Sequence, residues 1–177
     1  MKRKLGIYMG PTILFLTPAT VLRAEQAFSL GYGIAAFNTD KHVGRLDGSN
    51  YYDFIRGAYL CERPLLEKRL SLAIEPFGSY VNRPTSGAEG GLGVGLMYYP
   101  FRKGYDGFFI TGGPGIAYTS IQFQEQGTHL LFIVQGGFGY RYKDFFIENR
   151  IRHYSNGSTA RPNWSVNSNI LSIGFYY

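Results

Sequence analysis

The feature that most constrains the fold is an alternation of apolar with polar or small side chains, repeated in segments of about ten residues. In the segment 89–100, for example, Leu92, Val94 and Leu96 alternate with glycines. A period of two is that of a β-strand, whose successive side chains point to opposite faces. After residue 24 there is no run of 18 or more apolar residues, so the sequence predicts no membrane-spanning helix there.

The N-terminal sequence predicts export. The basic stretch MKRK precedes the mostly apolar LGIYMGPTILFLTPATVL, and Ala24 is a small residue suited to the position before a cleavage site. This order is typical of a secretory signal peptide. Pro11 and Pro18 interrupt a stretch that is already short for a membrane helix, which disfavours that alternative. We therefore expect a signal peptide at 1–24 and a single domain at 25–177.

Removal of the leader changes what the charge implies. The chain has 18 Lys and Arg against 12 Asp and Glu; four of the basic residues and none of the acidic ones precede residue 25, so 14 basic residues remain and the net charge falls from +6 to +2. A nearly neutral domain gives no reason to expect a nucleic acid partner. Cys61 is the single cysteine, which excludes an intramolecular disulfide and disfavours a metal site. No cofactor is expected.

An exported chain with alternating segments and many Tyr, Phe and Gly residues is typical of a transmembrane β-barrel. We predict an all-β fold, an eight-stranded antiparallel barrel in the outer membrane of a Gram-negative cell. Side chains fill the interior of such a barrel, so small lumen-facing residues explain the GGLGVG run better than a dinucleotide loop, which requires a following helix. The strands are expected at 27–38, 50–61, 67–80, 89–100, 107–119, 128–141, 144–155 and 166–177.

The lengths of the connections predict the orientation of the barrel. An even number of strands puts both chain ends in the periplasm, with short turns there and longer loops outside. The final aromatic, Tyr177, is similar to the C-terminal signature of such barrels. Arg56 and Ile133 leave the facing of the second and sixth strands ambiguous. Long connections are expected near 39–49, 81–88, 120–127 and 156–165, and short ones near 62–66, 101–106 and 142–143.

The seventh strand carries two polar residues on the side expected to face lipid. Its even positions include Glu148 and two arginines, which belong in the lumen, and its odd positions are largely apolar up to His153 and Ser155. Asn149 interrupts the apolar side without explanation. A neutral imidazole beside a hydroxyl can act as general base and make serine a nucleophile. The same two residues are also explained as interfacial side chains at the rim of a barrel.

The stretch RHYSN, with Pro162 and Asn163 after it, resembles the lipid A 3-O-deacylase family of outer-membrane barrels. The close match covers about 15 residues, and the strand pattern extends it loosely over the domain. The resemblance implies a serine esterase that removes an ester-linked acyl chain, the 3-O-linked hydroxyacyl chain, from lipid A in lipopolysaccharide.

The resemblance also implies roles for individual residues. Ser155 would attack the acyl carbonyl and His153 would take and return its proton. Asn156, with backbone N–H groups of the following loop, would stabilise the oxyanion, and Asn163 would shape the same site. Asn167 stands at the position where the best-known member of the family has an acidic residue that orients the histidine. Its amide oxygen can still accept the Nδ1 hydrogen bond, but it offers no full negative charge.

Several alternatives stay open at this point. The chain could be a non-catalytic structural or adhesive barrel, or an acyltransferase, although no acyl-acceptor motif is found. Arg161 and Lys41 could meet lipid phosphates or could be solvated loop charges. The expected partner is lipid A in the outer leaflet, and the sequence leaves open whether two barrels associate as a homodimer.

Overall fold

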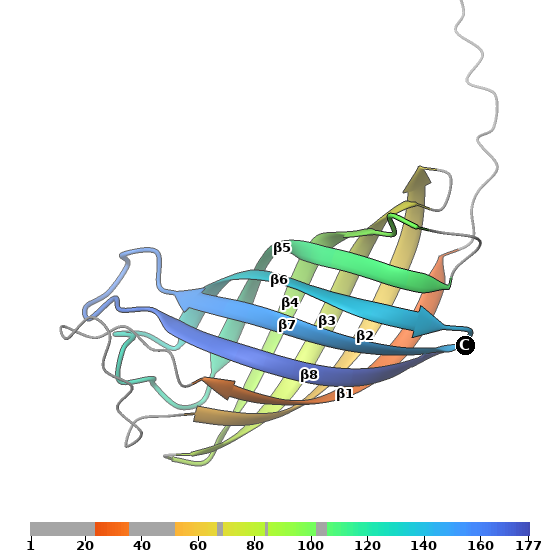
Figure 1. The fold of residues 1–177 in the computed structure, drawn as a ribbon. Helices are drawn as coiled ribbons and strands as arrows, with labels where there is room; N and C mark the ends of the chain where they lie inside the picture. The colour runs from red at the N-terminus through yellow and green to blue at the C-terminus, as the bar shows by residue number, and fades with distance from the viewer. Residues whose placement is uncertain (1–23, 36–51, 67–68, 84, 102–105) are drawn as a thin grey trace, which may run out of the picture.

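The computed structural model describes residues 24–35, 52–66, 69–83, 85–101 and 106–177. They form one closed barrel in which each strand pairs antiparallel with its neighbours in sequence and β8 pairs with β1 (Figure 1). The eight-stranded barrel expected from the sequence is therefore confirmed. The strands are β1 Glu25–Ala35, β2 Tyr52–Leu66, β3 Leu70–Arg83, β4 Gly87–Tyr98, β5 Gly107–Thr119, β6 Leu130–Tyr142, β7 Phe145–Ser155 and β8 Val166–Tyr176.

Two predicted connections are wrong. The segment 62–66 is predicted to be a short connection, but it continues β2 and pairs with the start of β3. Glu62 is buried there and accepts hydrogen bonds from Tyr99 and Tyr176, so its charge faces the lumen instead of a solvated turn. The expected long connection 81–88 is shorter, because β3 continues to Arg83 and β4 begins at Gly87.

Other predicted segments fall partly or wholly outside the described residues. The expected signal peptide lies outside them except for Ala24, and so do the expected connection 39–49 and the end of the first predicted strand. Lys41 belongs to the same undescribed stretch. Among the described residues there is no helix of the length and apolar character needed to cross a membrane.

The alternation along the strands puts apolar side chains on the outside of the barrel. Leu92, Leu96 and Tyr98 are exposed on β4, and Ile173 and Phe175 are exposed on β8, as expected for a wall that faces lipid. The two ambiguous strands are resolved by the same alternation. Arg56 and Ile133 are both buried in the interior, at 3% and 2% exposure.

The interior is built in layers. Apolar residues close both ends of the barrel: Phe54, Phe123 and Tyr154 belong to the cluster at the long-loop end, and Phe109 and Phe146 belong to the cluster near the termini. Polar and charged side chains lie between them. Because this interior is filled by packed side chains, the barrel gives no reason to expect a pore.

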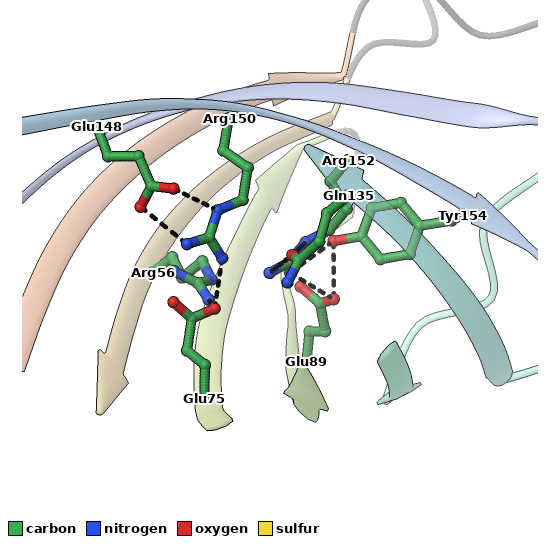
Figure 2. Close-up of polar contacts among 8 residues, drawn as sticks. All are labelled: Arg56, Glu75, Glu89, Gln135, Glu148, Arg150, Arg152 and Tyr154. Atoms are coloured by element: carbon green, nitrogen blue, oxygen red, sulfur yellow. Dashed lines mark hydrogen bonds and ion pairs between the residues drawn. The ribbon is translucent and has the colours of Figure 1, made fainter. Parts of the chain in front are cut away.

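The charged layer consists of paired side chains from several strands (Figure 2). Arg150 of β7 donates to both carboxylate oxygens of Glu148, at 3.0 and 2.8 Å, and to Glu75 of β3 at 2.5 Å. Glu75 also pairs with Arg56. Since Glu148 is buried and paired there, it is directed away from the outer wall on which His153 lies, as the parity of β7 predicts.

Candidate active site

The pairing of β7 with β8 brings His153 and Asn167 together on the outer wall. The two residues are directly opposite each other in the antiparallel ladder, and both side chains lie on the outward side of their strands. His153 Nδ1 is 2.8 Å from Asn167 Oδ1, which is a hydrogen bond of ordinary length. Residues 14 apart in sequence thus form one unit because the last hairpin sets their register.

The amide of Asn167 selects the tautomer of the imidazole. Its Nδ2 donates to Ser165 Oγ at 3.4 Å, so its Oδ1 is the atom that faces the ring. An acceptor at that position requires the proton on Nδ1 of His153, which leaves the lone pair on Nε2. This is the tautomer that a general base acting through Nε2 requires.

Ser155 is the last residue of β7 and lies on the same outward face as His153. Its Oγ donates to Asn163 Oδ1 at 3.3 Å and accepts from the backbone N–H of Gly157 at 3.1 Å. Within the described part of the chain, Ser155 makes no hydrogen bond to His153. A serine side chain moves between staggered positions by rotation about one bond, and catalytic hydrogen bonds often form only when substrate is bound.

The side chain of Asn156 folds the loop between β7 and β8 around itself. It is completely buried, and its Nδ2 donates to the carbonyls of Ala160 and Pro162 at 3.0 and 2.9 Å. Its Oδ1 accepts from the N–H of Ser158 at 2.9 Å. Both donor hydrogens of this amide are thus used inside the loop, and the geometry does not support the oxyanion role expected for this side chain.

Asn163 lies where Asn156 was expected to act. Its Oδ1 accepts from Ser155 Oγ and from the N–H of Asn156, at 3.3 and 3.1 Å, so the amide lies directly beside the Ser155 hydroxyl. Its Nδ2 donates to Ser158 Oγ at 3.3 Å on the exposed side of the loop. Because this partner is an exposed hydroxyl, which can turn to water, Nδ2 can be redirected toward a bound ligand.

Three further side chains have no part in these hydrogen bonds. Arg161 is exposed on the β7–β8 loop. His129 Nδ1 is 2.8 Å from the carbonyl of Thr119, and its ring stacks on Tyr118. Cys61 is half-buried in β2 and forms no disulfide. In the described ranges, no three His, Cys, Asp or Glu side chains are grouped as a metal ion would need.

The lipid-facing wall below the site contains a second polar pair and a groove. Asn149 and Asn169 exchange amide hydrogen bonds of 2.9 and 3.0 Å, which accounts for the polar residue that interrupts the apolar side of β7. The groove has a volume of about 300 Å³ and lies beside this pair. It is lined by Phe108, Phe138, Gly139, Tyr140, Ile147, Glu148, Asn149 and Leu171.

Sequence reasoning missed the residues that support this site from elsewhere in the chain. The connection 120–129 packs against the β7–β8 loop through an isolated bridge between Gln126 and Asn163. Tyr52, at the start of β2, holds that connection through Glu125. No local signal identifies these residues, because their contacts are with segments more than 30 residues away.

The comparisons with known proteins concern the family and the fold of the chain. Residues 64–176 match the family model described as lipid A 3-O-deacylase (PagL). The crystal structure of the outer membrane enzyme PagL superposes with a TM-score of 0.65 at 18% identity, covering 83% of this chain and 98% of that one. No curated protein matches the chain in sequence.

Two further solved barrels have the same fold. The N-terminal β-barrel domain of Pseudomonas aeruginosa OprF gives a TM-score of 0.53 at 15% identity, covering 88% of this chain and 100% of that one. Ail of Yersinia pestis gives 0.54 at 13% identity, covering 87% and 99%. At such low identity the likeness to solved structures concerns the fold alone.

Proposed function

The chain belongs to the lipid A 3-O-deacylase family of outer-membrane enzymes, and on that premise we propose that Ser155, His153 and Asn167 hydrolyse an acyl ester of lipid A. The observation that carries the assignment is the 2.8 Å hydrogen bond from His153 Nδ1 to Asn167 Oδ1 on the lipid-facing wall, two residues from an outward-facing serine. A hydrolase of a membrane lipid needs its nucleophile on this wall, since the substrate arrives from the bilayer.

The proposed reaction has two steps. Ser155 Oγ attacks the carbonyl carbon of the ester while His153 Nε2 takes the hydroxyl proton; the imidazolium then protonates the departing sugar oxygen, leaving an acyl-serine. A water molecule attacks the acyl-serine in the same way, with His153 taking a proton from the water and returning it to Ser155 Oγ. The products are a free fatty acid and lipid A with one hydroxyl restored.

We assign stabilisation of the oxyanion to Asn163 and the N–H of Gly157. The N–H of Gly157 donates to Ser155 Oγ at 3.1 Å, and Asn163 Oδ1 accepts from the same hydroxyl at 3.3 Å, so rotation of the Asn163 amide would bring its Nδ2 donor to this place. The side-chain donors of Asn156, in contrast, serve loop carbonyls. Donors beside the nucleophile stabilise the negative charge that develops on the carbonyl oxygen. In this proposal Asn156 shapes the loop that presents Gly157, and its role is in positioning.

Asn167 supplies orientation without charge. An amide oxygen holds the imidazole in the required tautomer, as the carboxylate of a Ser-His-Asp triad does, but it does not balance the imidazolium that forms during the reaction. We therefore expect the enzyme to work with part of the usual electrostatic stabilisation missing. Glu148 is no substitute, because it is paired with Arg150 inside the barrel.

The groove on the outer wall supports an acyl substrate. It begins near Asn149, six residues below Ser155 on the same face of β7, which is about 20 Å along a strand. Its walls are Phe, Tyr, Ile and Leu side chains, with which a hydrocarbon chain packs. The far part of a long acyl chain whose ester lies at Ser155 can therefore rest in this groove.

The experiment is mass spectrometry of lipopolysaccharide from cells that express the full chain. Loss of one hydroxyacyl chain supports the proposal, an added chain would indicate acyl transfer, and an unchanged lipid A would contradict the assignment. Ser155→Ala serves as the control and should abolish the change. Every side chain assigned here comes from β7, β8 and the loop between them, so the proposed site needs no homodimer.

Export is part of the same proposal. We assign residues 1–24 as the signal peptide and 25–177 as the mature barrel. The intact mass of the protein purified from outer membranes should correspond to a chain that begins at Glu25, and a mass that includes the leader would contradict this assignment.

A further inference from the structure

The side chain of Gln126 is buried between the two ends of the loop 156–165, which joins β7 to β8 and is here called the catalytic loop. Gln126 lies in the connection 120–129 between β5 and β6 and is 0% exposed, although loop glutamines are mostly solvated. It is separated by 27 or more residues from every residue assigned to the reaction. The side chain of Gln126 is therefore buried only because the two loops pack against each other.

The amide of Gln126 joins the two stems of the catalytic loop. Its Nε2 donates to the carbonyl of Tyr154, at 3.4 Å, and to the carbonyl of Trp164. Tyr154 immediately precedes Ser155, and Trp164 immediately follows Asn163. The opposite orientation of the amide would set Oε1 against two carbonyl oxygens, so chemistry determines which end faces the stems.

Backbone contacts reinforce this arrangement on both sides. Gln126 forms an antiparallel bridge with Asn163, the N–H of Gly127 donates to the carbonyl of Pro162 at 2.7 Å, and the N–H of Trp164 donates to the carbonyl of Glu125 at 2.8 Å. The segment around Asn163 is therefore held along its length by the neighbouring loop. The catalytic loop does not by itself determine where Asn163 lies.

The connection 120–129, which contains Gln126, is itself attached to the barrel. Phe123 is completely buried in the apolar cluster at this end. The hydroxyl of Tyr52 donates to Glu125 Oε2 at 2.7 Å and accepts from the N–H of Gln124 at 3.0 Å. Gln126 is thus presented from a rigid base, which is what a residue needs in order to set the geometry of another loop.

We propose that Gln126 is a positioning residue for the reaction, which sets the separation of Asn163 and Ser155 by holding the carbonyls next to each of them. It touches neither substrate nor reacting atoms. The inference deepens the proposed function and rests on it. Gln126 Oε1 is buried with no hydrogen-bond partner in the described part of the chain. The hydrogen bonds of the Gln126 amide are therefore made by Nε2.

Two variants of Gln126 test this role. Gln126→Met has about the same length and removes the donor, and Gln126→Asn keeps an amide that is too short to reach both carbonyls. Gln124→Met is the matched control, because Gln124 lies in the same loop with an exposed side chain. The measurements are kcat and KM on hexa-acylated lipid A in detergent micelles, and the rate at which a fluorophosphonate probe labels Ser155. Folding is checked by the migration of unheated protein in gel electrophoresis.

Folded Gln126→Met and Gln126→Asn should lower kcat by about 10- to 100-fold and leave KM within about twofold, because displacement of a catalytic group by about 1 Å has effects of this size. Labelling of Ser155 should slow in parallel, and Gln124→Met should behave as wild type. A folded variant of Gln126 with wild-type kcat and labelling overturns the inference. A wild-type enzyme that releases no acyl chain overturns the proposed function itself, and the inference with it.

A double variant separates positioning from general loss of structure. If Gln126 acts through Asn163, then adding Gln126→Met to Asn163→Ala should lower the labelling rate by less than about threefold beyond Asn163→Ala alone. If the labelling rate of the double variant instead falls by the product of the two single-variant effects, Gln126 acts independently of Asn163 and the inference is overturned.

Discussion

His153 Nδ1 and Asn167 Oδ1 lie 2.8 Å apart across the last two strands of the barrel, on the wall that faces lipid. An antiparallel register that sets these residues opposite each other provides the orientation that catalytic histidines receive from a carboxylate in other hydrolases. The pair is neutral, which suits a position beside hydrocarbon, where an isolated charge would be strongly disfavoured.

Asn167→Asp tests whether the neutral pair limits the rate. A carboxylate would keep the Nδ1 hydrogen bond and also stabilise the imidazolium, so kcat is expected to rise about tenfold, while Asn167→Leu should lower it by about 100-fold through loss of the tautomer preference. The measurement is single-turnover release of fatty acid from lipid A. Equal rates for the Leu variant and wild type would show that Asn167 does not orient His153.

Asn163→Ala removes the proposed oxyanion donor. We expect kcat to fall by about 100- to 1,000-fold with little change in KM, since the lost interaction forms only in the transition state. Steady-state kinetics on lipid A would measure both values. If the variant keeps more than a third of the wild-type kcat, Asn163 does not stabilise the oxyanion.

The amide pair on the outer wall predicts a non-additive effect on stability. Asn149→Leu or Asn169→Leu alone leaves one amide without its partner and should lower the free energy of unfolding by about 1–3 kcal/mol. The double change to Leu should restore most of this loss, because both polar groups are gone. Urea unfolding in lipid vesicles can be followed by the fluorescence of Trp164, the single tryptophan. Additive losses in the double variant would contradict the pairing.

The charged interior predicts a large effect at Arg150. Arg150→Met leaves the carboxylates of Glu148 and Glu75 without the guanidinium that both contact (Figure 2), and should lower the free energy of unfolding by about 3–5 kcal/mol. Arg161→Met, which changes an exposed loop residue, should stay within about 0.5 kcal/mol of wild type. The same vesicle unfolding assay compares the two, and similar values for both variants would show that the buried network contributes little.

Gly127 predicts a steric effect on activity. A Cβ at this position would overlap the carbonyl of Arg161, so Gly127→Ala should push the two loops apart and lower kcat by about 10-fold or more. Gly90 provides a control with the same substitution, because a Cβ there meets nothing closer than 4.0 Å. If Gly127→Ala and Gly90→Ala have the same activity in the lipid A assay, the close contact of the loops has no part in catalysis.

The amino-acid sequence by itself determined the barrel and the direction in which its wall residues face. Each side chain of a strand points opposite to the one before it, so the outward position of His153 and Ser155 follows from parity alone. The same local rule placed Glu148 inside. The short connection expected at 62–66 is instead part of a strand, because whether a strand continues depends on its pairing with a partner strand.

Only the tertiary structure decided how the loops divide their polar groups. Asn156 and Asn163 are chemically identical, and a sequence cannot say which amide folds the loop and which lies beside Ser155. The contact of Gln126 with the β7–β8 loop is likewise visible only in the folded structure. Hydrogen bonds between loops depend on which segments barrel closure brings together, and closure is a property of all eight strands at once.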